Sequence, residues 1–202
     1  MIARYEEQLK AKQALLRQSL IKYAHVNPRL IEKIRSSEDQ LGYRNQCKLP
    51  CAMVDGRLVT GMYLPNSNYF QAVEHCPVHE SGLETMRRKI LDVLNQFALS
   101  SYDYHQKRGI RSLIIRGFDG AYQACLVTGL DEISGQCIDA LMAIDGLESL
   151  WQSIHTVKKT ADMFGTKMIH LGGNRHLYIT LDDLKLQCSP RSFFSVKYKA
   201  GA

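Results

Sequence analysis

Apolar residues recur at helical spacing in two long stretches of the chain. The first, residues 1–24, has a charged opposite face and predicts a helix that ends before Pro28, because the residue before a proline avoids helical backbone. The second, residues 81–97, predicts a helix whose Ser81 and Glu84 match a capping box. Weaker patterns predict helices over residues 29–35 and 134–144.

Short apolar runs separated by turn signals predict strands in the rest of the chain. Asp55-Gly56 and Asp119-Gly120 are typical hairpin turns, and the Gly-Gly-Asn run at 172–174 is interpreted as the turn of another hairpin. The predicted strands cover residues 42–53, 58–63, 70–74, 110–118, 122–129, 150–157, 168–171, 177–181 and 184–188. Since no repeated strand–helix–strand rhythm is present, the sequence predicts an α+β fold, a largely antiparallel sheet built from hairpins with flanking helices.

The charge balance narrows the class of partner. Of the 202 residues, 45% are hydrophobic and 23% are charged, which is typical of an ordinary globular protein. The net charge of +6 favours a polyanionic partner, either nucleic acid or an anionic surface. Arg87 and Arg88, in the middle of the second long helix, are expected to project outward. No apolar run reaches the roughly 18 residues of a membrane span, and the charged N-terminus lacks a signal-peptide core, so a cytoplasmic chain without a membrane partner is expected.

Residues 189–196 combine a turn signal with aromatic and basic side chains. Ser189-Pro190 opens the turn, and Phe193 and Phe194 follow at once. Such a segment can present a ring to a nucleobase while nearby cations contact phosphate. The alternative interpretation is a terminal strand whose phenylalanine rings lie in the core.

Several segments, in their order along the chain, resemble the RNA (uracil-5-)-methyltransferase family, whose members make 5-methyluridine in ribosomal or transfer RNA. These segments are YEEQLKAKQALL at 5–16, GYRNQCKL at 42–49, HCP at 75–77, RGIRSLIIRG at 108–117 and SPRSFFSV at 189–196. The resemblance covers nearly the whole chain. It implies that the chain corresponds to the middle of a longer enzyme.

The resemblance also implies a division of the chain into three parts. Residues 1–35 would form an N-terminal helical segment, 36–188 a central α+β RNA-recognition domain, and 189–202 the start of the catalytic domain. In the family that domain is Rossmann-like, binds S-adenosylmethionine and supplies the cysteine nucleophile and a glutamate base. The chain is expected to lack it, and therefore to bind RNA without catalysing methylation alone or holding a cofactor. A monomer is expected.

Individual positions carry the resemblance further. Cys76 matches one ligand of the family's iron–sulfur cluster, but because its three partner cysteines would lie upstream of Met1, a free thiol and no metal are expected. Phe193 matches the aromatic residue that packs on the extruded uracil, where a ring must replace lost base stacking. Ser195 falls where the family usually has a glutamine that contacts the methyl donor.

The residues expected to contact RNA are mostly basic and lie near strands that the family places against RNA. They are Tyr43, Arg44, Lys48, Lys107, Arg108, Arg111, Arg116 and Phe193. The alternative is that the charges are merely solvated and that Tyr43 and Phe193 are structural. Two other functions stay open: an enzyme whose missing chemistry comes from another polypeptide, and a non-catalytic RNA- or protein-interaction protein on a degenerate form of the fold.

Overall fold

The computed structural model describes residues 4–158, 162–181 and 183–193, and the chain divides into two units, Met1–Gln40 and Leu41–Ala202. In the first unit, helix α1 (Tyr5–Ala24) is followed by the 3-10 turn η1 (Pro28–Leu30). The helix predicted over 29–35 is wrong, because the chain runs extended after this turn. The Gln13 and Tyr5 side chains of α1 bond the backbone of that extended segment instead.

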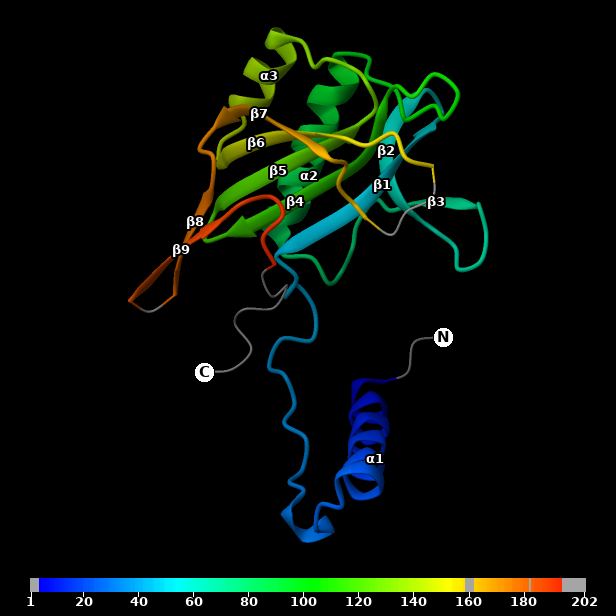
Figure 1. Cartoon of the computed structure of the whole chain (residues 1–202), viewed down its shortest axis with the longest axis vertical. Helices are drawn as coiled ribbons and strands as arrows, with labels where there is room; N and C mark the ends of the chain where they lie inside the picture. The colour runs from blue at the N-terminus through cyan, green and yellow to red at the C-terminus, as the bar shows by residue number, and fades with distance from the viewer. Residues whose placement is uncertain (1–3, 159–161, 182, 194–202) are drawn as a thin grey trace. The chain divides into compact units, whose positions relative to one another are not determined.

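The second unit is built on a seven-stranded sheet with the order β3-β2-β1-β4-β5-β6-β7 (Figure 1). Neighbouring strands are antiparallel except β5 and β6, which are parallel. The predicted α+β class with a largely antiparallel sheet is confirmed. The elements of this sheet and its helices are β1 (Gln46–Val54), β2 (Arg57–Tyr63), β3 (Phe70–Ala72), α2 (Ser81–Gln96), β4 (Ile110–Phe118), β5 (Ala121–Thr128), α3 (Gly135–Met142), β6 (Leu147–Ile154) and β7 (Lys167–Gly173).

The hairpin predicted around residues 172–174 is wrong. Strand β7 pairs with β6, whereas β8 (Leu177–Leu181) pairs with β9 (Leu184–Cys188) in a separate two-stranded sheet. Gly173 has a φ of 72° and directs the chain away from the large sheet. The β8–β9 hairpin packs Leu177 and Ile179 on Phe118, at the turn between β4 and β5. The two glycines therefore end one sheet instead of turning within it.

Helices α2 and α3 cover one face of the large sheet and bury its main core (Figure 1). Alternate residues of β1 (Cys47, Leu49) and of β4 (Leu113, Ile115) enter this core. The residues between them point to the opposite face, as the two-residue period of a strand requires. That helix-free face carries the candidate site. Among the described residues, no helix combines the length and apolarity needed to cross a bilayer.

Candidate nucleic-acid interface

A turn at residues 189–192 is held against the helix-free face by a buried arginine. Arg116, on β4, donates from Nη1 to the Ser189 carbonyl at 3.3 Å and from Nη2 to the Ser192 carbonyl at 2.5 Å. Its side chain is only 4% exposed, and this burial lowers the pKa of the guanidinium. Arg116 was predicted to contact RNA, but the structure shows its guanidinium engaged with the turn, so we assign it a positioning role.

Arg116 is one member of a row of buried polar residues that crosses four strands. Gln46 pairs in register with Arg116, Arg116 with Gln123, and Gln123 with Ser149. Gln123 donates to the Ser149 hydroxyl at 3.1 Å and to the Cys188 carbonyl at 3.3 Å. Because an unpaired buried carbonyl is costly, this row fixes where the chain leaves β9 and enters the turn.

The turn is also closed by its own side chains. The Ser189 amide donates to the Ser192 hydroxyl at 2.9 Å, and the Ser192 amide donates to the Ser189 carbonyl at 3.0 Å. Pro190 is buried and lines a small cavity together with Ile114 and Cys125. Arg191 donates to the Gly165 carbonyl and lies over the Phe164 ring, 5.6 Å from its centroid. The turn is thus bonded from both sides.

Phe193 follows this anchored turn with its ring in solvent. It is 96% exposed, the highest value among the exposed large hydrophobic residues that the structure describes. The alternative that Phe193 lies in the core is therefore wrong for the described chain. Phe194 and Ser195 lie outside the described residues. An exposed ring on a fixed turn is available for stacking at little ordering cost.

Of the three residues predicted to contact RNA in and before β1, one is exposed and two are half-buried. Lys48 is exposed on the helix-free face of β1, opposite Ile114 in register. Tyr43 and Arg44 are half-buried before β1. The Arg44 amide donates to the Val78 carbonyl at 2.7 Å, and the Glu80 amide donates to the Arg44 carbonyl at 3.0 Å.

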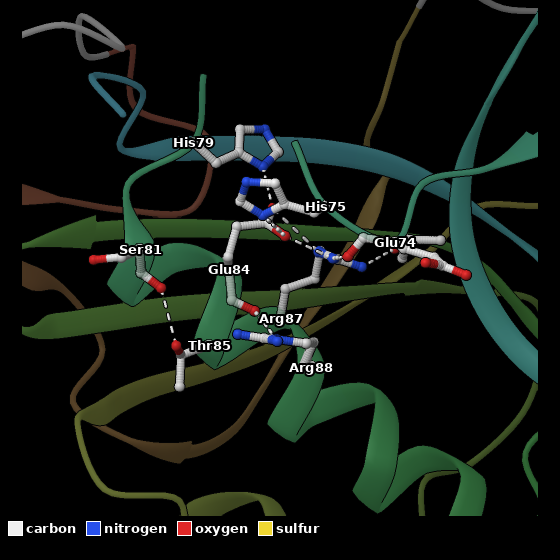
Figure 2. Close-up of polar contacts among 9 residues, drawn as sticks. Glu74, His75, His79, Ser81, Glu84, Thr85, Arg87 and Arg88 are labelled. Atoms are coloured by element: carbon white, nitrogen blue, oxygen red, sulfur yellow. Dashed lines mark hydrogen bonds and ion pairs between the residues drawn. The ribbon is translucent and has the colours of Figure 1, made fainter. Parts of the chain in front are cut away.

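The segment that holds Arg44 is itself anchored by a buried ionic network (Figure 2). The Glu84 carboxylate lies between the His79 ring, at 2.6 Å, and the Arg87 guanidinium, at 2.7 Å. Arg87 also donates to the Thr60 hydroxyl at 2.8 Å and to the Glu74 carbonyl at 2.6 Å. The network thus joins α2 to β2 and to the loop after β3.

Two predictions about α2 are corrected by this network. Arg87 does not project outward: it is 3% exposed, because its guanidinium finds a carboxylate and two further acceptors inside, whereas Arg88 is exposed as predicted. Glu84 does not complete a capping box, since the helix begins at Ser81 after an N-cap residue, Glu80, that makes no side-chain cap bond. Burial opposes ionisation of Glu84, but hydrogen bonds from Arg87 and His79 outweigh it and lower the pKa of the carboxyl.

Cys76 lies in the anchored loop as a half-buried free thiol. His75 and His79 lie on either side of it, four residues apart. The sequence alone did not predict that this spacing brings both rings to one carboxylate. Both rings approach Glu84, at 3.8 Å and 2.6 Å from Nδ1 to a carboxylate oxygen. Within the described ranges, no group of three or more histidine, cysteine, aspartate or glutamate side chains is arranged to hold a metal ion.

The remaining predicted cations lie in and beside the loop before β4. Lys107 and Arg108 are exposed in this loop. Arg111 is half-buried, and its Nη1 donates to the Val157 carbonyl at 2.7 Å and lies 3.0 Å from Nδ1 of His155. The structure therefore leaves Lys48, Lys107 and Arg108 as exposed cations and gives Arg111 and Arg116 structural partners.

Comparisons with known proteins give these features a context. No family model matches the sequence. A protein named uncharacterized RNA methyltransferase from Streptococcus agalactiae is 30% identical over 202 residues, covering 95% of this chain and 44% of that protein. A protein of the same name from Bacillus cereus is 27% identical over 201 residues, covering 95% of this chain and 43% of that protein. The resemblance to RNA methyltransferases is confirmed.

A solved structure shares the fold. The Pyrococcus abyssi tRNA (uracil-54, C5)-methyltransferase, solved with S-adenosyl-L-homocysteine, superimposes with a TM-score of 0.70 at 17% identity. The match covers 96% of this chain and 45% of the archaeal protein. This chain thus spans less than half the length of the relatives it matches.

Proposed function

We propose that this chain is the RNA-recognition part of an RNA (uracil-5-)-methyltransferase acting on ribosomal or transfer RNA in the cytoplasm. The observation that carries the proposal is the exposed Phe193 ring directly after a turn that Arg116 fixes from within the sheet. A base turned out of its stack needs an aromatic face to replace its lost neighbours. Similarity to RNA methyltransferases over 95% of the chain supports the same role.

The chain would bind RNA without transferring a methyl group by itself. A nucleotide-like donor such as S-adenosylmethionine is usually cradled by a glycine-rich turn between a strand and a helix. The described strands and helices contain no such turn, and Ser195, the donor position of the family, lies outside them. We assign donor binding and the cysteine nucleophile to another part of the parent protein.

Binding of a labelled single-stranded oligouridylate at several salt concentrations tests the proposal. We expect affinity to fall steeply with salt, because cations such as Lys48, Lys107 and Arg108 release counterions from phosphate. If about 4 phosphates are neutralised, the log–log slope should be about −3. Absence of binding at low salt, or binding that ignores salt, would contradict the proposal and favour an interaction protein on the same fold.

A parallel assay tests the catalytic part of the proposal. The isolated chain is incubated with RNA and S-adenosylmethionine carrying a labelled methyl group. We expect no transfer above a no-protein control, because an activated thiolate must stand beside the donor methyl group for attack at the pyrimidine carbon. Transfer above that control would show that the chain itself is an enzyme.

A further inference from the structure

Two pairs of aromatic side chains lie at the β2–β3 edge and in the loop before β4. Tyr63 and Phe70, paired across β2 and β3, have ring centroids 5.5 Å apart in an edge-to-face arrangement. Tyr102 and Tyr104 are packed in the same way at 5.0 Å. Tyr63 is 51% exposed and Tyr104 is 50% exposed. In each pair one ring supports another that faces solvent.

Arg111 packs against the second pair. Its guanidinium carbon lies 5.6 Å from the centroid of Tyr102 and 5.8 Å from that of Tyr104, within cation–π range. The Tyr102 and Tyr104 rings therefore lie against the Arg111 side chain, which is itself held by the Val157 carbonyl.

The strand pattern places Tyr63 on the same side of the sheet as Lys48. Leu58 enters the core beneath α2, and the Thr60 hydroxyl accepts a bond from α2, so the odd-numbered residues of β2 face away from the helices. The Phe70 ring covers Gly61 on that side, where an added Cβ would lie 2.5 Å from the ring. The aromatic pair thus lies on the helix-free face.

Hydrogen bonds within the loop that carries Tyr104 close it at both ends. The Asp103 carboxylate accepts hydrogen bonds from the amides of His105, at 2.6 Å, and Gln106, at 3.0 Å. The Asp103 amide donates to the Arg108 carbonyl at 2.7 Å, closing the loop. Gly109 has a φ of 97°, which a larger residue rarely adopts, and its amide bonds the Asp131 carboxylate at 2.5 Å. Such preorganisation reduces the ordering cost of binding.

The positive charge beside the exposed rings favours a nucleic acid over a protein as the ligand of this surface. Lys107 and Arg108 project from the same loop, and no salt bridge between described residues involves them or Arg111. Exposed rings beside such cations match an unpaired nucleobase with its phosphate, because every base offers a π-face and every phosphate a negative charge. A protein partner would instead require an acidic, apolar surface.

We propose that Tyr104, braced by Arg111, and Tyr63, braced by Phe70, form a second stacking surface that takes unpaired bases of single-stranded RNA, with Lys107 and Arg108 on the flanking phosphates. This inference rests on the proposed function and extends it from the single ring at Phe193 to a longer track of RNA. Stacking of this kind tolerates any base, so the surface adds affinity without reading sequence.

The test compares two probes of equal length and charge, a labelled oligouridylate and its abasic ribose-phosphate counterpart. Tyr104→Ala and Tyr63→Ala should each weaken oligouridylate binding by about 5- to 150-fold and leave binding of the abasic probe unchanged. Tyr104→Phe and Tyr63→Phe keep the rings and should bind as the wild type does. Tyr178→Ala removes a 54% exposed tyrosine from β8 and serves as the matched control. Thermal melts confirm that each variant is folded.

The outcomes separate this inference from the proposed function. Wild-type binding that depends on Phe193 but not on Tyr63 or Tyr104 would overturn the second surface alone. Equal losses for both probes, or a phenylalanine variant as weak as the alanine variant, would also overturn it. If the wild-type chain binds neither probe at low salt, both proposals fail together.

Discussion

The guanidinium of Arg116 donates to the Ser192 carbonyl at 2.5 Å, one residue before the exposed ring of Phe193. A residue near the end of β4 thereby fixes the position of an aromatic side chain more than seventy residues later in the chain. A buried charge without partners is destabilising, so the guanidinium of Arg116 keeps these carbonyls in place and thereby holds the turn of the candidate site.

Replacing the exposed ring tests the site directly. Phe193→Ala should weaken binding of single-stranded RNA by about 1–3 kcal/mol and leave the salt slope unchanged, because stacking releases no counterions. The melting temperature should not change, since 96% of the residue is already in solvent. Phe193→Trp, which keeps a stacking face, should restore affinity. A lower melting temperature with unchanged affinity per folded molecule would show a packing role instead.

Removing the anchor should loosen the turn. Arg116→Ala leaves the Ser189 and Ser192 carbonyls without their donor and should lower the free energy of unfolding by about 1–3 kcal/mol. Arg116→Lys should not restore it, because an ammonium lacks the planar fork that reaches both carbonyls. Limited trypsin digestion should then cut faster after Arg191. Unchanged cleavage at this position would mean that Arg116 does not hold the turn.

The ionic network around Glu84 predicts how stability depends on pH. The pKa of Glu84 is lowered in the folded chain, so the unfolded chain takes up the proton first as pH falls. The stability that the ionised Glu84 contributes is fully present above the unfolded pKa of about 4.3 and is lost as the pH falls below it through the lower folded pKa. Chemical unfolding at several pH values should show this loss in the wild type and a flatter profile in Glu84→Gln.

The same variant should also be less stable at neutral pH. Glu84→Gln leaves Arg87 as a buried charge without its carboxylate and should cost about 3 kcal/mol. Asp92→Asn is the control, because Asp92 pairs with Arg57 at 3.5 Å on the surface, with side-chain exposures of 65% and 68%. An exposed pair of this kind should contribute about 1 kcal/mol or less. Equal losses from both variants would contradict the special role of the buried network.

The exposed cations of the loop before β4 should act through phosphate alone. Changing Lys107 and Arg108 together to alanine should weaken RNA binding and flatten the log–log salt slope by about 0.7 for each phosphate that is no longer neutralised. Changing Arg88 and Lys89, which are exposed on α2, removes the same charge and should have little effect. If both pairs change the slope equally, the basic charge acts diffusely and not through this loop.

The sequence by itself determined most elements of the fold and indicated a class of partner. Long periodic stretches predicted α1 and α2, and the Asp-Gly turns predicted the β1–β2 and β4–β5 hairpins, because these signals depend on local backbone geometry. The family resemblance rested on short local segments and was likewise readable from the chain. Phe193 could be singled out, but not whether its ring was in the core or in solvent.

Only the tertiary structure decided which of the charges are buried and which strands pair. Arg87, Arg88 and Arg116 are the same residue type but lie in different environments. Arg87 pairs with Glu84, Arg116 donates to the carbonyls of a distant turn, and Arg88 is exposed to solvent. Gly173 ends a strand because β7 pairs with β6. The local Gly-Gly run does not indicate this pairing. Burial and pairing depend on residues far apart in the chain, and for that reason local patterns could not predict them.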